Sequence, residues 1–185
     1  MDESAIWAWR HPRAIGAAGR CIGMTDVPVD GRKAKRLARR VQRFARRAGL
    51  PRVIFTSDLR RCADVGRWLR RWGWIHHVAP MLRELDFGAW EGRRWSDIDR
   101  TDIDTWCCNF SRHAPGGGEA LHAMLERAAS WQAKLPAIMI AHAGWMLARR
   151  WQQEGREPPS TAQDWPASPR HGECWSFEAG VKCLQ

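Results

Sequence analysis

Three apolar runs of the sequence end on side chains that could bind or attack a phosphate group. These runs and the side chains that follow them are AIWAW (5–9) with Arg10 and His11, RVIFTS (52–57) with Arg61, and AIMIA (137–141) with His142. Guanidinium groups offer forked N–H donors to phosphoryl oxygens, and a neutral imidazole can act as a nucleophile. If the three runs end at one edge of a sheet, these groups form a phosphate site that needs no metal ion. The alternative is that Arg10 and His11 only cap a strand in solvent.

Short apolar runs and segments of helical periodicity alternate along the chain, and these elements must position the side chains above. We expect strands at 5–9, 52–57, 76–80, 137–142 and 173–179, the last of them at a sheet edge. We expect helices at 32–47, 59–73, 95–112, 119–134 and 144–155, and a loop over 81–92. Strands that alternate with helices predict an α/β fold with a mostly parallel sheet, in which the carboxyl ends of the strands meet at one rim.

The length of the chain and its cysteine spacing limit the class of protein. A chain of 185 residues can bury a proper core, so we expect a single domain over residues 1–185. No apolar stretch approaches the roughly 18–20 residues of a membrane-spanning helix, and no signal-peptide pattern opens the chain. The six cysteines, which lack C-x-x-C spacing, are Cys21, Cys62, Cys107, Cys108, Cys174 and Cys183. We therefore expect no zinc site or disulfide framework, and reduced thiols in a cytoplasm.

Much of the formal net charge of +10 lies in one basic segment, GRKAKRLARRVQRFARR (31–47). Leu37, Val41, Phe44 and Ala48 recur at helical spacing, so basic side chains cover the other faces of the predicted helix. One hypothesis is a nucleic-acid-binding surface, and the other is a solvated face in an arginine-rich protein. Because no groove-reading motif is present and no aromatic ring lies among the charges, we do not expect a nucleic-acid partner. An anionic substrate would still be attracted by this field.

Five motifs, in the same order along the chain, resemble those of the histidine phosphatase superfamily, whose members are also called phosphoglycerate-mutase-like proteins. The motifs are RHP (10–12), SDLRR (57–61), LRELDFGAWEG (82–92), PGGGE (115–119) and AHAGW (141–145). Within the superfamily, RHP followed by GRCIGMTDVPV (19–29), together with the late GECWSFE (172–178), most resembles the α-ribazole phosphatase branch. The resemblance implies a three-layer α/β/α sandwich with a mostly parallel central sheet.

The resemblance also implies metal-independent hydrolysis of phosphate monoesters through a phosphohistidine. His11 would attack phosphorus and carry the phosphoryl group. Arg10 and Arg61 would hold the phosphoryl oxygens, with His142 as a further donor. Glu84 would protonate the leaving alkoxide and then take a proton from the attacking water. Without the family context, Glu84 could instead be a surface carboxylate beside an arginine.

Several loop residues differ from the usual pattern of the superfamily, and these differences bear on the substrate. Ala14 and Ala17 stand where a threonine and an asparagine are usual, and Pro12 replaces a glycine. We expect the substrate to be bound by Arg10, Arg61, His142, Arg20, Thr25 and Glu119. Trp90 and Trp95 could stack on a base, although core packing is the alternative.

The most specific function that the resemblance implies is hydrolysis of α-ribazole 5′-phosphate in cobalamin (lower-ligand) biosynthesis. The alternatives are another phosphatase of the superfamily acting on a sugar phosphate, a nucleotide or a phosphoprotein, a phosphoglycerate mutase, and a non-catalytic basic protein that binds nucleic acid. We expect a phosphorylated small molecule as substrate, inorganic phosphate or vanadate as competing anions, and no cofactor, metal or membrane partner. The sequence does not predict an oligomeric state.

Overall fold

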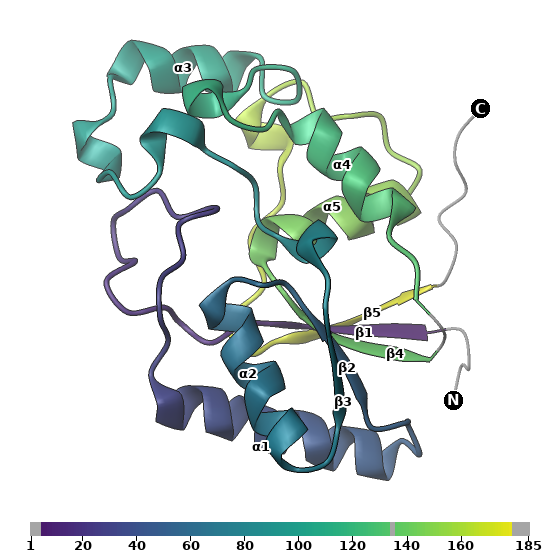
Figure 1. Ribbon diagram of the computed structural model, residues 1–185. Helices are drawn as coiled ribbons and strands as arrows, with labels where there is room; N and C mark the ends of the chain where they lie inside the picture. Colours follow the sequence, from purple (N-terminus) through teal and green to yellow (C-terminus); the bar gives the residue numbers. More distant parts are fainter. Residues whose placement is uncertain (1–4, 134–135, 179–185) are drawn as a thin grey trace.

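A five-stranded sheet forms the centre of the computed structural model, which describes residues 5–133 and 136–178 (Figure 1). The strands are β1 (Ala5–Arg10), β2 (Val53–Thr56), β3 (Ile75–Val78), β4 (Ala137–Ala141) and β5 (Cys174–Glu178). Their order is β3-β2-β4-β1-β5, with β5 antiparallel to β1 and the other neighbours parallel. The mostly parallel sheet and the edge position of the last strand are therefore confirmed.

Helices cover both faces of the sheet, which confirms the three-layer α/β/α sandwich (Figure 1). The helices are α1 (Gly31–Arg47), α2 (Arg60–Arg71), α3 (Arg100–Cys108), α4 (Leu121–Ser130) and α5 (Ala143–Gln153). α1 and α2 pack on one face together with Trp9 and Ile140 of the strands. α4 and α5 pack on the opposite face with Ile6 and Met139. Because side chains alternate along a strand, β1 and β4 contribute to both cores.

The basic segment forms α1, as its periodicity predicts. The Asp30 carboxylate accepts hydrogen bonds from the N–H groups of Arg32 and Lys33 at 2.8 and 3.1 Å, and this side-chain cap fixes the start of the helix. Leu37 and Val41 are buried against the sheet. The apolar stripe therefore docks α1, and the basic side chains are left to cover the outside.

One predicted helix is much shorter in the structure. In place of a single helix over 95–112, a 3₁₀ turn precedes α3, which begins only at Arg100. The Asp99 carboxylate accepts a hydrogen bond from the Thr101 N–H at 2.7 Å. This local cap starts a new helix and ends the continuity that the sequence suggested.

The predicted helix over 119–134 is also shorter, since α4 spans only Leu121–Ser130. The buried Arg149 guanidinium of α5 donates to carbonyl oxygens of the last turn of α4, including that of Ala128 at 2.8 Å. These carbonyl groups have no partner within the helix, so a cation stabilises this end. Lys134 lies outside the described residues.

None of the helices in the described ranges is long and apolar enough to cross a lipid bilayer. The described cysteines, all free thiols, are Cys21, Cys62, Cys107, Cys108 and Cys174. Cys183 lies outside the described residues. Burial raises the pKa of the Cys62 thiol to about 12, so this thiol stays protonated next to the site described below.

Candidate active site

The parallel register of β1 and β4 sets His11 and His142 side by side. Arg10 pairs with Ala141 across the sheet, and the His11 N–H donates to the Ala141 carbonyl oxygen at 3.1 Å. The next residue of each strand is then an imidazole, and the two ring centroids lie 5.1 Å apart. β2 pairs with the other side of β4, so Ser57 reaches the same rim. The residues that follow the three apolar runs therefore come together.

A cavity of about 450 Å³ opens at this rim of the sheet. Its lining consists of Arg10, His11, Arg13, Ala14, Ala17, Ala18, Arg20, Ile22, Arg61, Glu84 and His171. The lining thus includes the predicted nucleophile, the predicted acid and both predicted phosphate-binding arginines. Of the other predicted contacts, Arg20 lines the cavity, whereas His142, Thr25 and Glu119 are not part of the lining.

The ring of His11 is held in one tautomer. Its Nδ1 lies 2.7 Å from the Pro12 carbonyl oxygen, which can only accept a hydrogen bond. Nδ1 therefore carries the proton, and Nε2 keeps its lone pair. Burial lowers the pKa of His11 well below its usual value, and the nearby Arg61 guanidinium lowers it further. A neutral imidazole with a lone pair on Nε2 is the form that can attack phosphorus.

A buried pair, Arg61 and His142, connects the start of α2 to the end of β4. The Arg61 Nε–H donates to His142 Nδ1 at 3.2 Å, so the proton of the neutral ring is on Nε2, which donates to Ser57 Oγ at 2.7 Å. Burial lowers the pKa of His142 well below its usual value, with Arg61 adding to the shift. Both ring nitrogens of His142 are therefore occupied in this structure, where the ring positions Arg61, and its role as a donor to phosphate stays a prediction.

The terminal nitrogens of Arg61 are also held in place. They donate to the carbonyl oxygens of Gly23 and of Thr25, the latter at 2.8 Å. Each terminal nitrogen carries a second N–H group. The guanidinium is therefore fixed by three contacts and keeps donors for a ligand in the cavity.

The Arg10 guanidinium likewise keeps a donor free. One terminal nitrogen donates to the Pro169 carbonyl oxygen at 2.5 Å, whereas Nε is buried without a hydrogen-bond partner among the described residues. Burial lowers the pKa of Arg10, and the carboxylates of Glu84 and Glu173 oppose this shift. Arg10 lines the cavity, so N–H groups of its guanidinium are candidate donors to a bound phosphoryl oxygen.

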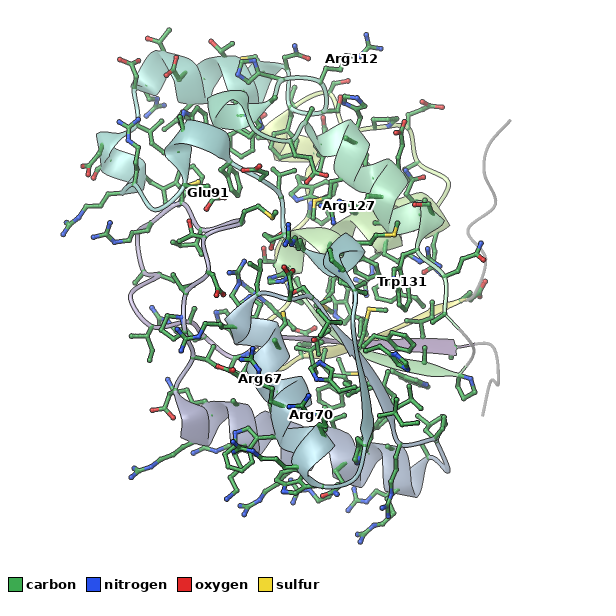
Figure 2. All side chains as sticks on the ribbon, viewed as in Figure 1. Arg67, Arg70, Glu91, Arg112, Arg127 and Trp131 are labelled. Carbon is green, nitrogen blue, oxygen red and sulfur yellow. The ribbon has the colours of Figure 1, made fainter. Side chains whose placement is uncertain are left out.

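Backbone N–H groups fix the Glu84 carboxylate at the cavity. Oε2 accepts from the Gly144 N–H and Oε1 from the Leu85 N–H, both at 3.1 Å. Gly144 lies in the first turn of α5, where N–H groups have no partner in the helix and favour an anion. Arg127 of α4, labelled in Figure 2, holds the segment before Glu84 by donating to backbone carbonyl oxygens, including that of Arg83 at 2.9 Å.

Thr25 and Glu119, which the sequence suggested as substrate contacts, have structural partners instead. Thr25 Oγ1 donates to the Glu91 carboxylate, and its carbonyl oxygen accepts from Arg61. Glu119 pairs with Arg127 at 2.7 Å. In this structure both residues hold groups that support the cavity wall, and their contact with a substrate stays a prediction.

Glu91 is a positioning residue that sequence reasoning missed. Its carboxylate, on the side chain labelled in Figure 2, accepts hydrogen bonds from the backbone N–H groups of Gly23, Met24, Thr25 and Phe87. Burial alone would raise the pKa of Glu91, but these bonds and the one from Thr25 Oγ1 keep it below its usual value. Since Gly23 and Thr25 hold Arg61 by their carbonyl oxygens, Glu91 fixes the loop that positions this guanidinium.

His171 is a cavity residue that the sequence did not reveal. Its Nδ1 lies 3.1 Å from the His11 carbonyl oxygen, and the two ring centroids lie 5.5 Å apart. In the antiparallel pairing of β5 with β1, Cys174 is opposite Trp9, so the loop before β5 reaches the carboxyl end of β1. The sequence predicted the edge strand but not its direction, and only the antiparallel direction brings His171 here.

Trp90 and Trp95 pack in an aromatic cluster and do not line the cavity. Trp106 contacts both rings, edge-on to Trp90 at 5.8 Å and stacked on Trp95 at 6.4 Å between ring centroids. Phe87 packs edge-on against Trp95 at 5.8 Å. The packing alternative for the two tryptophans therefore describes the structure, and the stacking alternative does not.

The residues that the structure describes contain no group of three or more His, Cys, Asp or Glu side chains arranged to hold a metal ion. The cations in the cavity lining are Arg10, Arg13, Arg20 and Arg61. Glu84 is its only carboxylate among the described residues. The cavity is thus suited to an anion.

Comparisons with known proteins show the family of the chain. The family model of the histidine phosphatase superfamily (branch 1) matches residues 6–148. An adenosylcobalamin/alpha-ribazole phosphatase of Salmonella typhimurium is 26% identical over 151 residues, which are 75% of this chain and 74% of the relative.

Solved structures share the fold. A mycobacterial glucosyl-3-phosphoglycerate phosphatase superposes with a TM-score of 0.73 at 22% identity, covering 94% of this chain and 89% of that chain. The protein TTHB049 from Thermus thermophilus gives a TM-score of 0.66 at 27% identity, covering 93% of this chain and 92% of that chain. The mycobacterial enzyme has also been solved in complex with VO3 and with inorganic phosphate. The match over residues 6–148 shows that this chain belongs to the histidine phosphatase superfamily, branch 1, and is a phosphatase.

Proposed function

We propose that the chain hydrolyses phosphate monoesters in two steps, with His11 Nε2 as the nucleophile. The observation that carries this proposal is the Nδ1 contact of His11 with the Pro12 carbonyl oxygen, which leaves the Nε2 lone pair in a buried, neutral ring. Such a ring needs no base to activate it. Arg10 and Arg61, which line the same cavity, would hold the phosphoryl oxygens as their charge redistributes.

In the first step a bond forms between His11 Nε2 and phosphorus while the phosphorus–oxygen bond to the alcohol breaks. Protonated Glu84 gives its proton to the leaving alkoxide, so the alcohol departs neutral. In the second step the Glu84 carboxylate takes a proton from water as the water oxygen attacks phosphorus. The phosphorus–nitrogen bond breaks, its electron pair returns to Nε2, and inorganic phosphate leaves.

Positive charge for this reaction would come from the guanidinium groups rather than from a bound cation. Arg10, which lines the cavity, and the remaining terminal N–H groups of Arg61 would supply the donors. We therefore expect turnover to survive exhaustive chelation with EDTA. Loss of turnover with EDTA that a divalent ion restores would contradict metal independence. Vanadate and inorganic phosphate should compete with substrate, which the complexes of the mycobacterial relative support.

We propose α-ribazole 5′-phosphate as the substrate to test first, as in cobalamin biosynthesis, because the curated Salmonella relative is named for it and matches three quarters of this chain. The cavity lining favours a sugar phosphate as a second candidate. It holds Arg13 and Arg20 but, among the residues that the structure describes, no Trp or Phe ring on which a base could stack. A turnover screen that includes both compounds, each at equal concentration, separates the two candidates by kcat/KM.

The proposed nucleophile is tested by His11→Ala. This variant should fold and lose turnover of p-nitrophenyl phosphate by at least about 10³-fold, because it removes the Nε2 lone pair that attacks phosphorus. Mixing with labelled substrate and quenching in base should trap an acid-labile phosphohistidine in the wild type only. His122→Ala, at an exposed histidine outside the cavity, is the control. Near-normal turnover of His11→Ala would rule out the mechanism.

A further inference from the structure

A second cavity, of about 270 Å³, adjoins the catalytic one. Its lining consists of Pro12, Arg13, Lys33, Arg36, Leu37, Arg40, His171 and Gly172. Arg13 and His171 line both cavities. A ligand bound by His11 could therefore extend past His171 along α1 without leaving the protein surface.

The charged side chains that line the second cavity are all cations. They are Arg13, Lys33, Arg36 and Arg40, and no carboxylate of the described residues belongs to the lining. In the described part of the chain, no carboxylate lies within 4.0 Å of these four groups, whereas several other arginines form ion pairs. The cations are therefore available to a ligand.

Three of the cations follow one stripe of α1. Lys33, Arg36 and Arg40 are spaced by three and four residues, and Leu37 is buried between them. Like charges at this spacing repel one another and destabilise a helix. α1 contains no acidic residue that could offset the repulsion. A bound anion would remove it.

The Trp9 ring and the loop beside His171 lie close to Arg40 at the far side of this cavity. The Arg40 guanidinium lies over the Trp9 ring, 5.2 Å from the centroid. Gly172 has a φ of +74°, and a Cβ there would lie 3.0 Å from Arg40 Nη1. The loop next to His171 therefore passes close to Arg40. The Nδ1 contact with the His11 carbonyl oxygen fixes His171 between the two cavities.

We propose that the second cavity binds an additional phosphoryl group of the substrate, so that the enzyme acts on small molecules with two phosphate groups. A phosphoryl dianion suits this cluster because it can accept hydrogen bonds from several guanidinium groups at once. A nucleic-acid strand fits less well, since no Trp, Phe or Tyr ring lines the cavity and single strands are bound by aromatic stacking. The inference rests on the proposed catalytic steps, but not on α-ribazole 5′-phosphate as the substrate.

The test compares paired substrates that differ by one phosphate group. The pairs are glucose 1,6-bisphosphate with glucose 6-phosphate, and adenosine 3′,5′-bisphosphate with adenosine 5′-monophosphate. In the wild type, kcat/KM should be at least about 10-fold higher for the bisphosphate of one pair or both. The ratio should decline with added salt, since the Debye length falls from about 8 Å at 0.15 M to about 3 Å at 1 M.

The double variant Lys33→Gln/Arg36→Gln should lower the bisphosphate-to-monophosphate ratio by about 10-fold to 100-fold, the loss expected for one or two charge-assisted contacts. The ratio cancels any effect on the chemical step. Arg39→Gln/Arg43→Gln removes the same charge from exposed positions of α1 outside the cavity and should keep the ratio of the wild type.

Four results would overturn the inference. The first is equal kcat/KM within both substrate pairs, and the second is an equal fall of the bisphosphate-to-monophosphate ratio in the two double variants. The third is an unchanged ratio in Lys33→Gln/Arg36→Gln. The fourth is that the wild type binds a single-stranded oligonucleotide, and Lys33→Gln/Arg36→Gln weakens this binding without changing the ratio. Failure of the proposed function is a different result, because the wild type would then form no phosphohistidine and turn over no p-nitrophenyl phosphate.

Discussion

The Glu84 carboxylate accepts a hydrogen bond from the Gly144 N–H at 3.1 Å, across sixty residues of sequence. A Cβ at position 144 would lie 2.2 Å from Glu84 Oε1, a distance that no side chain tolerates. Only a glycine therefore lets the first turn of α5 approach the carboxylate so closely. The contact aligns the proposed proton donor with the helix end that lies beside His142.

Gly144→Ala should displace the Glu84 carboxylate and slow the transfer of a proton to the leaving group. We expect kcat for an alkyl phosphate such as glycerol 2-phosphate to fall by about 10-fold to 10³-fold, within the range of general acid catalysis. p-Nitrophenyl phosphate should lose less, because p-nitrophenolate leaves without help. Steady-state kinetics on both substrates checks this, and equal losses would show a general distortion of the site.

Glu91→Gln should loosen Arg61 without touching it. The partners of the carboxylate named above are N–H donors. A carboxamide would turn its own NH₂ group toward one of these N–H groups, and no hydrogen bond could form there. We expect a loss of about 1–3 kcal/mol in the free energy of unfolding and weaker inhibition by vanadate. Denaturant titrations and inhibition constants are the measurements. Glu126→Gln removes the same charge from an exposed site on α4 and should change neither; matching effects would contradict the positioning role.

Buried neutral histidines should make the fold less stable in mild acid. Burial lowers the pKa of His11 and of His142 well below 6.5, and it lowers the pKa of His76 to about 4. Below pH 6.5 the unfolded chain binds protons that the native chain does not. The contribution of these histidines to the free energy of unfolding is therefore fully present above pH 6.5 and is lost as the pH falls. His11 and His142 each contribute to this loss through the proton that only the unfolded chain binds.

Denaturant unfolding at pH 7.5 and at pH 5 measures this loss. We expect the free energy of unfolding of the wild type to be lower at pH 5 by about 1–4 kcal/mol. In His11→Ala the difference should be smaller, because one of the buried rings is gone. Equal stability at the two pH values would show that the native rings take up protons as readily as the unfolded chain.

Arg149→Met should destabilise the fold through the end of α4. The Arg149 Nη1 donates to the carbonyl oxygens of Ala128 and Ala129 at 2.8 and 2.9 Å, and methionine cannot replace these bonds. We expect a loss of about 1–3 kcal/mol with kcat/KM for p-nitrophenyl phosphate little changed. Thermal unfolding measures the effect. Arg43→Met, at an exposed position of α1, should have no comparable cost.

Trp90→Ala should act through packing rather than through substrate binding. Trp90 is buried beside Trp106, so its removal should cost about 3–5 kcal/mol of stability. Turnover of α-ribazole 5′-phosphate and of p-nitrophenyl phosphate should then fall by the same factor. A rise in KM confined to α-ribazole 5′-phosphate would show that the ring stacks on the substrate after all.

The sequence by itself determined the strands, most helices and the residues at the strand ends. Short buried strands carry a strong local pattern, and α/β connectivity predicts that β1, β2 and β4 are parallel, so Arg10, His11 and His142 were expected at one rim. Two helices were predicted too long. In α3 a side-chain cap at Asp99 outweighs the continuous periodicity, and a cap of this kind is a local competition that apolar spacing does not report.

The tertiary structure alone decided what each polar group touches. His171 enters the site because β5 runs antiparallel to β1, and a single strand pattern does not fix direction. Glu91 and Thr25 face each other across distant loops, which turns a predicted substrate contact into a support for Arg61. Such pairings depend on register and loop packing between segments far apart in the chain. Short sequence motifs therefore specify the reactive residues at the strand ends, whereas the contacts that position these residues form only when the chain folds.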